Sequence, residues 1–103
     1  MIFRPPIPSN HLLSKETMSE WYVYMVRCSD ESLYTGITKD VERRIEEHNG
    51  GGLSGARYTR ARRPVRLVCR EIMNSRSEAA KREFEIKRLS KEEKEALVMR
   101  SNQ

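Results

Sequence analysis

The sequence predicts a small α/β (α+β) domain in which helices flank a three-stranded antiparallel sheet, in the order ββαβαα. Three observations predict this fold class. Three short segments are rich in aromatic and β-branched residues, and three longer segments carry helix start signals. The chain of 103 residues also has room for only one small domain.

The first two strands are predicted to form a hairpin. Residues 21–28 (WYVYMVRC) and 33–37 (LYTGI) have strand composition and are separated by the turn residues SDES. Tyr24 and Tyr34 are an even number of residues apart, so they share a face of the hairpin only if the loop has an odd length or contains a bulge. The third strand is predicted at 65–72 (VRLVCREI), which is entered through Pro64.

Each predicted helix begins at a capping residue. An Asp or Ser side chain at this position accepts a hydrogen bond from the first turn, and a Glu three residues later completes a capping box. The predicted helices are 41–49, begun by Asp40 and ended by Gly50, 76–89, begun by Ser75 with Glu78, and 91–99, begun by Ser90 with Glu93. The basic, glycine-rich segment 50–64 is predicted to be a loop.

Residues 1–19 are expected to be a disordered tail, and 20–100 the folded domain. The first segment contains all but one of the four prolines and shows no hydrophobic period. Met18, immediately before the patterned region, is an alternative start of the protein. No apolar run approaches the roughly 20 residues of a membrane span.

The composition favours a polyanionic partner. Charged residues make up 34% of the chain and the net charge is +5, which favours nucleic acid as the partner and leaves the chemistry open. The two cysteines, Cys28 and Cys69, have no paired spacing, so neither a disulfide framework nor a zinc site with His48 is indicated. The expected location is the cytoplasm.

Polar side chains interrupt the apolar faces of two predicted helices. At 100° per residue, His48 falls between Val41 and Ile45 on the buried stripe, and Arg44 lies on its flank. Arg43, Glu42, Glu46 and Glu47 are predicted to point away. On the second helix Glu83 projects into an apolar arc, and its partner is either Arg44 or a bound cation, because burying an unpaired charge costs several kcal/mol.

These residues resemble the GIY-YIG nuclease superfamily. The two motif segments are VYM at 23–25 and YTG at 34–36. Where the family commonly has Gly-Ile-Tyr, this chain has Tyr22-Val23-Tyr24. Arg44 follows Tyr34 by ten residues and His48 follows four later, as in the family's helix signature, while AAKREFEIK resembles the helix that carries the metal-binding glutamate, here Glu83. The segment GARYTRARRPVRLV is similar to small stand-alone bacterial members and to catalytic domains that cut branched DNA.

The resemblance implies an endonuclease that hydrolyses phosphodiester bonds in DNA with little sequence specificity, in DNA repair or recombination. Glu83 would hold one Mg²⁺ or Mn²⁺ ion, and Arg44 would grip the phosphate. Tyr24 would accept a proton from the attacking water with help from a base such as His48, and Tyr34 would position the water or the phosphate. Gly36 would allow close approach of the backbone.

The basic segment supplies the predicted nucleic-acid contacts. They are Arg57, Tyr58, Arg60, Arg62 and Arg63. The DNA would be branched or single-stranded, and an RNA substrate is equally compatible with the site. Two other interpretations remain open at this point: a nucleic-acid-binding module that cuts poorly or not at all, and a structural Glu83–Arg44 ion pair beside a core histidine.

Overall fold

The computed structural model describes residues 20–50 and 55–101. Its strands are β1 (Trp21–Arg27), β2 (Leu33–Thr38) and β3 (Arg66–Met73), and its helices are α2 (Val41–Asn49), α3 (Arg57–Arg60), α4 (Arg76–Lys87) and α5 (Lys91–Ser101). The predicted order of strands and long helices is confirmed. The expected tail at 1–19 and the alternative start at Met18 lie outside the described residues.

The three strands form one antiparallel sheet in the order β2-β1-β3. In the β1–β2 hairpin Tyr24 pairs with Gly36 and Val26 pairs with Tyr34. This register places both tyrosines on one face, because the loop Cys28–Ser32 has an odd number of residues. Cys28 belongs to that loop and not to the strand, since its N–H donates to Ser32 O at 2.8 Å and closes the turn.

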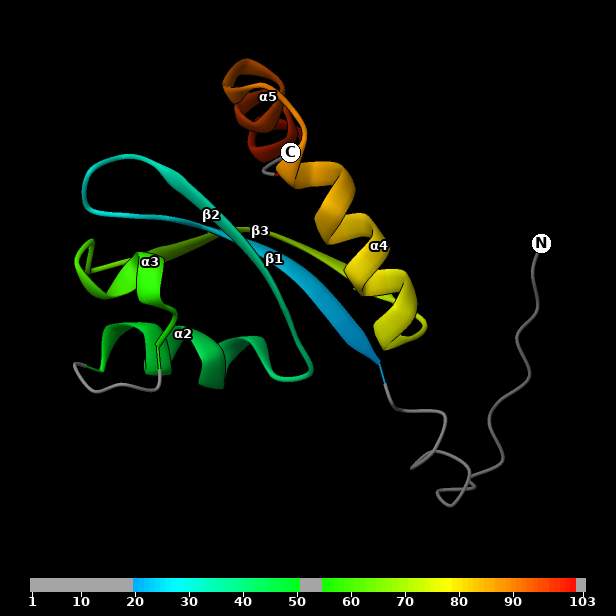
Figure 1. Ribbon diagram of the computed structural model, residues 1–103, viewed down its shortest axis with the longest axis horizontal. Helices are drawn as coiled ribbons and strands as arrows, with labels where there is room; N and C mark the ends of the chain where they lie inside the picture. Colours follow the sequence, from blue (N-terminus) through cyan, green and yellow to red (C-terminus); the bar gives the residue numbers. More distant parts are fainter. Residues whose placement is uncertain (1–19, 51–54, 102–103) are drawn as a thin grey trace.

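The sheet separates two hydrophobic layers (Figure 1). On one face α4 and α5 cover Val23 and Met25 of β1, and on the other face α2 and α3 lie beside Tyr24 and Val26. All four of these β1 side chains are at most 1% exposed. Alternation along the central strand therefore assigns Tyr24 to the face that α2 covers.

The predicted capping residues start the three long helices. Asp40 accepts from Arg43 N at 3.1 Å and Ser75 Oγ accepts from Glu78 N at 3.1 Å. Ser90 and Glu93 form the full capping box, since Ser90 N donates to Glu93 Oε1 at 2.8 Å and Glu93 N donates to Ser90 Oγ at 3.1 Å. These caps fix where α2 and α4 begin, and hence which of their residues face the sheet.

One element differs from the sequence expectation. Residues 57–60, predicted as loop, form the short helix α3, whose N-cap residue Ala56 makes no side-chain capping bond. The strand and helix ends otherwise differ from prediction by one or two residues, as helix and strand ends commonly do. No helix in the described part of the chain is both long and apolar enough to cross a membrane.

Candidate active site

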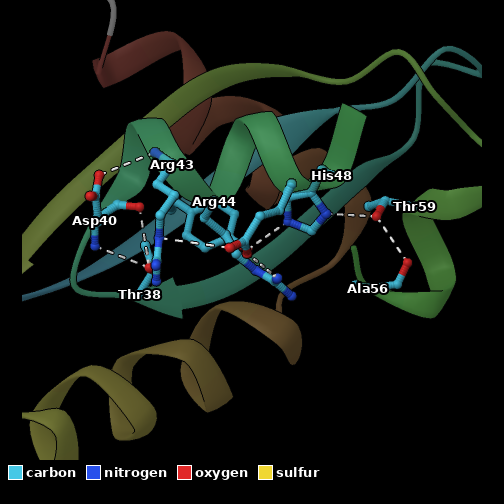
Figure 2. A network of polar contacts seen from close by, with 9 residues as sticks. Thr38, Asp40, Arg43, Arg44, His48, Ala56 and Thr59 are labelled. Carbon is cyan, nitrogen blue, oxygen red and sulfur yellow. Dashed lines mark hydrogen bonds and ion pairs between the residues drawn. The ribbon is translucent and has the colours of Figure 1, made fainter. Parts of the chain in front are cut away.

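Helix α2 presents Arg44 and His48 to the sheet. Its start is held against the end of β2, because Asp40 N donates to Thr38 Oγ1 at 3.1 Å. Arg44 and His48 follow one turn apart on the same side of the helix (Figure 2). His48 is fully buried and Arg43 is 68% exposed, as predicted.

Tyr24 and His48 form the buried centre of the site. The Tyr24 hydroxyl lies 2.8 Å from His48 Nε2, and neither residue is more than 1% exposed. The other ring nitrogen of His48, Nδ1, lies 2.7 Å from Oγ1 of Thr59, which is also fully buried (Figure 2). A strand, α2 and α3 thus each contribute one member of a continuous polar chain.

Burial keeps both central groups neutral near pH 7. It lowers the pKa of His48 to about 4, with the neighbouring Arg44 charge acting in the same direction. Burial also raises the pKa of the Tyr24 phenol to about 12, although a hydrogen bond from the Arg44 side chain opposes that shift. A neutral imidazole beside a phenol can accept the phenol proton at physiological pH.

Arg44 is tied to an acidic side chain on its own helix. Its Nη1 lies 2.8 Å from Glu47 Oε1, and both side chains are more than two-thirds buried. The expectation that Glu47 points away is therefore wrong, because its carboxylate pairs with Arg44 on the flank of the helix as well as with the exposed Arg43. Arg44 also donates to Tyr24, so its charge is held beside the phenol.

Tyr34 and Gly36 line the same site from β2. The Tyr34 ring makes an edge contact with the His48 ring, with centroids 5.5 Å apart. Among residues 20–50 and 55–101 its hydroxyl has no hydrogen-bond partner, so it is available to a water or a phosphate. A Cβ added at Gly36 would lie 2.6 Å from the Tyr24 hydroxyl oxygen, which explains why this strand position has no side chain.

Glu83, on α4, is close enough to the site for its charge to affect Tyr24. Its side chain is 23% exposed, and its charge contributes to raising the pKa of Tyr24. The ion pair seen for Glu83 is with Lys87, at 3.2 Å, one turn along the same helix. Lys87 is half-exposed, so an ion that competes for the Glu83 carboxylate would displace a surface amine that water can solvate.

A comparison with protein families identifies this arrangement. The sequence profile of the GIY-YIG catalytic domain matches residues 20–96. The chain belongs to the GIY-YIG family. Tyr24, Tyr34, Arg44, His48 and Glu83 all lie within the matched region, on β1, β2, α2 and α4.

Similar GIY-YIG chains are small proteins of the UPF0213 group. A UPF0213 protein of Desulfotalea psychrophila is 58% identical over 81 residues, which cover 79% of this chain and 73% of the relative. One from Haloquadratum walsbyi is 59% identical over 77 residues, covering 75% and 84%. The solution NMR structure of the UPF0213 protein BH0048 from Bacillus halodurans is 49% identical, covers 78% of this chain and 83% of that chain, and superposes with a TM-score of 0.50.

The basic segment of this GIY-YIG domain is more structured than its composition indicates. The Tyr58 ring stacks on Tyr34 at 5.8 Å, and the Arg62 guanidinium lies 3.9 Å above the Tyr58 ring centre. Arg62 Nε also donates to Asp30 at 3.0 Å. Tyr58 and Arg62 therefore anchor α3 to the hairpin, whereas Arg57 is exposed and Arg60 and Arg63 are half-buried.

Two contact residues of the site were not predicted. Thr59 lies in a segment that the sequence predicts as loop. Helical geometry predicts that Glu47 lies on the outer face of its helix. The signal for Thr59 was its hydroxyl among basic residues, which carries little information without the fold.

Among the described residues, no group of three or more His, Cys, Asp or Glu side chains is placed to hold a metal ion.

Proposed function

We propose that this chain is an endonuclease that hydrolyses phosphodiester bonds in DNA with the help of one divalent metal ion. The observation that carries the proposal is the buried Tyr24 hydroxyl, which contacts a neutral histidine at 2.8 Å and accepts a hydrogen bond from an arginine. A phenolic hydroxyl can both donate and accept a hydrogen bond. This one lies between a base and a phosphate-binding cation, as a proton relay requires.

The relay begins at the attacking water. Tyr24 accepts a proton from the water as its own hydroxyl proton passes to His48 Nε2, so the phenolate never needs to accumulate despite the pKa of about 12. The water oxygen forms a bond to phosphorus, and the bond from phosphorus to the leaving oxygen breaks. Arg44, with its planar fork, neutralises the charge that develops on the phosphate oxygens, and Tyr34 orients the water or phosphate.

Glu83 is the residue proposed to hold the metal ion. Its carboxylate is a hard oxygen ligand, it is mostly buried, and its present partner Lys87 is half-exposed and replaceable. A bound Mg²⁺ or Mn²⁺ ion would stabilise negative charge on the phosphate and leaving oxygens. One protein carboxylate suits Mg²⁺, which usually keeps several waters and takes further oxygens from the substrate.

The proposed substrate path runs along α3 and the residues after it. The predicted contact residues are Arg57, Tyr58, Arg60, Arg62 and Arg63. Within this set the arginines would contact phosphates, and Tyr58 would hold α3 in place because its ring is already stacked between Tyr34 and Arg62. Phosphate contacts carry no base information, so we propose cleavage directed by DNA structure, as in repair or recombination in the cytoplasm.

The direct experiment is a cleavage assay with purified protein on single-stranded, duplex and branched DNA and on RNA, with magnesium, manganese or EDTA. Cleavage of at least one DNA that needs the metal ion is expected. Tyr24→Phe should lower it by about 100-fold or more, while Tyr22→Phe, on the same strand and face, should not. Metal-dependent cleavage of RNA alone would reassign the substrate, and binding without any cleavage would favour a binding module.

A further inference from the structure

We infer that Thr59 is a positioning residue that fixes the tautomer of His48 and thereby the direction in which the Tyr24 proton moves. The inference rests on the proposed function for its catalytic consequence. The tautomer itself is a property of the folded protein and can be measured without any substrate. Thr59 is fully buried, and its Oγ1 lies 2.7 Å from His48 Nδ1.

The hydrogen-bond partners of the Thr59 hydroxyl decide which atom is the donor in its contact with His48. The Thr59 hydroxyl has one proton, which it donates to the Ala56 carbonyl oxygen at 3.1 Å (Figure 2). Its oxygen is then left to accept, and the group that can donate to it is His48 Nδ1–H. A neutral imidazole carries one ring proton, so Nε2 is the acceptor nitrogen.

The Tyr24 end of the chain leads to the same assignment independently. The Tyr24 oxygen already accepts from Arg44, and within the described residues His48 Nε2 is the acceptor available for its proton. If Nε2 carried the ring proton, the Tyr24 oxygen would have to accept from it across 2.8 Å, and the buried phenol proton would have no acceptor among the described residues. Both ends of the chain therefore place the ring proton on Nδ1.

The fold holds Thr59 firmly enough for this role. Thr59 lies on α3, whose first turn is closed by backbone bonds from Thr59 N and Arg60 N to Ala56 O, both at 3.1 Å. Gly55 packs so closely on α2 that an added Cβ would lie 3.1 Å from the His48 Cα. The adjacent Tyr58 is clamped between Tyr34 and Arg62. The hydroxyl is therefore positioned by a segment that is anchored on both sides.

The tautomer is tested by long-range ¹H–¹⁵N correlation spectra of the imidazole at neutral pH, with His48→Gln to assign the signals of the two histidines. Wild-type protein should show Nδ1 protonated and Nε2 unprotonated. Thr59→Val keeps the shape but removes the acceptor, so its His48 should shift toward the Nε2-protonated form, and Thr59→Ser should retain the wild-type pattern. A wild-type His48 protonated at Nε2 would overturn the inference.

Cleavage kinetics then test the catalytic consequence. In Thr59→Val kcat should fall about 10- to 100-fold with KM little changed, because the phenol loses its proton acceptor while the phosphate contacts remain. Thr59→Ser should keep most of the activity. Equal kcat in wild type and Thr59→Val would refute the positioning role. If the wild type shows the expected tautomer but cleaves no nucleic acid, the proposed function fails and the tautomer assignment stands.

Discussion

At the scale of single residues, the site depends on what each side chain does to its neighbour. Tyr24 and Tyr34 could be predicted to share a face once the loop between their strands was assigned an odd length, because strand alternation leaves no other choice. The placement of Arg44 and His48 followed from helical periodicity. The pairing of Arg44 with Glu47 did not, since side-chain rotamers decide it and the helical wheel does not.

Gly36 tests the close approach of β2 to Tyr24. In Gly36→Ala the new Cβ would lie 2.6 Å from the Tyr24 hydroxyl oxygen, so the buried ring must move and its contact with His48 must stretch. We expect cleavage to fall at least about 10-fold and stability to fall by about 1–3 kcal/mol, measured by kinetics and by denaturant unfolding. Wild-type activity in a normally folded Gly36→Ala protein would show that Tyr24 is not positioned as described.

His48 makes a prediction about pH. Its pKa is about 4 in the folded protein and about 6.5 in the unfolded chain, so the unfolded state binds more protons between these values. The contribution of neutral His48 to the free energy of unfolding should therefore be fully present above pH about 6.5 and be lost as the pH drops toward about 4. The His48→Gln variant should lack this contribution between pH 5 and 6.5, by denaturant unfolding, and an unchanged pH slope would contradict the assigned pKa.

The same pKa governs activity. In the proposed mechanism His48 must be neutral to accept a proton, and its pKa of about 4 means that it becomes protonated only near or below that pH. The acid limb of the kcat/KM profile of the wild type should accordingly fall well below the ordinary histidine pKa of 6.5. An acid limb centred near 6.5 would indicate that the histidine of the working enzyme is exposed to solvent.

At the scale of elements, the capping residues predicted where the three long helices begin. The short helix α3 was not predicted because it has no capping side chain. Asp40, Ser75 and Ser90 each make the predicted bond to the backbone. The short helix α3 has no capping side chain and follows a glycine-rich segment, so neither periodicity nor capping signals could reveal it. Thr59 was missed for the same reason, because its contact with His48 exists only once α3 packs against α2.

Asn49 joins α2 to the entrance of β3. Its Nδ2 donates to Val65 O at 3.0 Å, and its Oδ1 accepts from Val65 N at 2.8 Å. Asn49→Ala leaves both backbone groups without these partners, so we expect a loss of about 1–3 kcal/mol and a Tm several degrees lower by thermal unfolding. Asn74→Ala, at an exposed position, is the control. Equal Tm values for the two variants would exclude Asn49 as a structural link.

At the scale of the whole molecule, Glu83 is distant in sequence from the other proposed site residues and comes from a helix in a different layer of the fold. Helix α4 covers the opposite face of the sheet from α2, and β2 is an edge strand. The family resemblance carried the prediction that Glu83 belongs with Tyr24, Arg44 and His48, because no local pattern relates α4 to α2. Glu83 pairs with Lys87, and burial is the main cause of the raised pKa of Tyr24, to which the Glu83 charge adds in the same direction.

The central claim is metal-dependent hydrolysis at this site, and the most direct test is the magnesium dependence of cleavage by wild type and Glu83→Gln. Glutamine keeps the shape of the side chain and removes its charge. We predict that cleavage falls by about 100-fold or more in Glu83→Gln, with DNA binding and Tm retained, while Glu85→Gln on the same helix behaves as wild type. If Glu83→Gln cuts as well as wild type, or if its Tm falls with or without magnesium while the wild type cuts no nucleic acid, the account is contradicted.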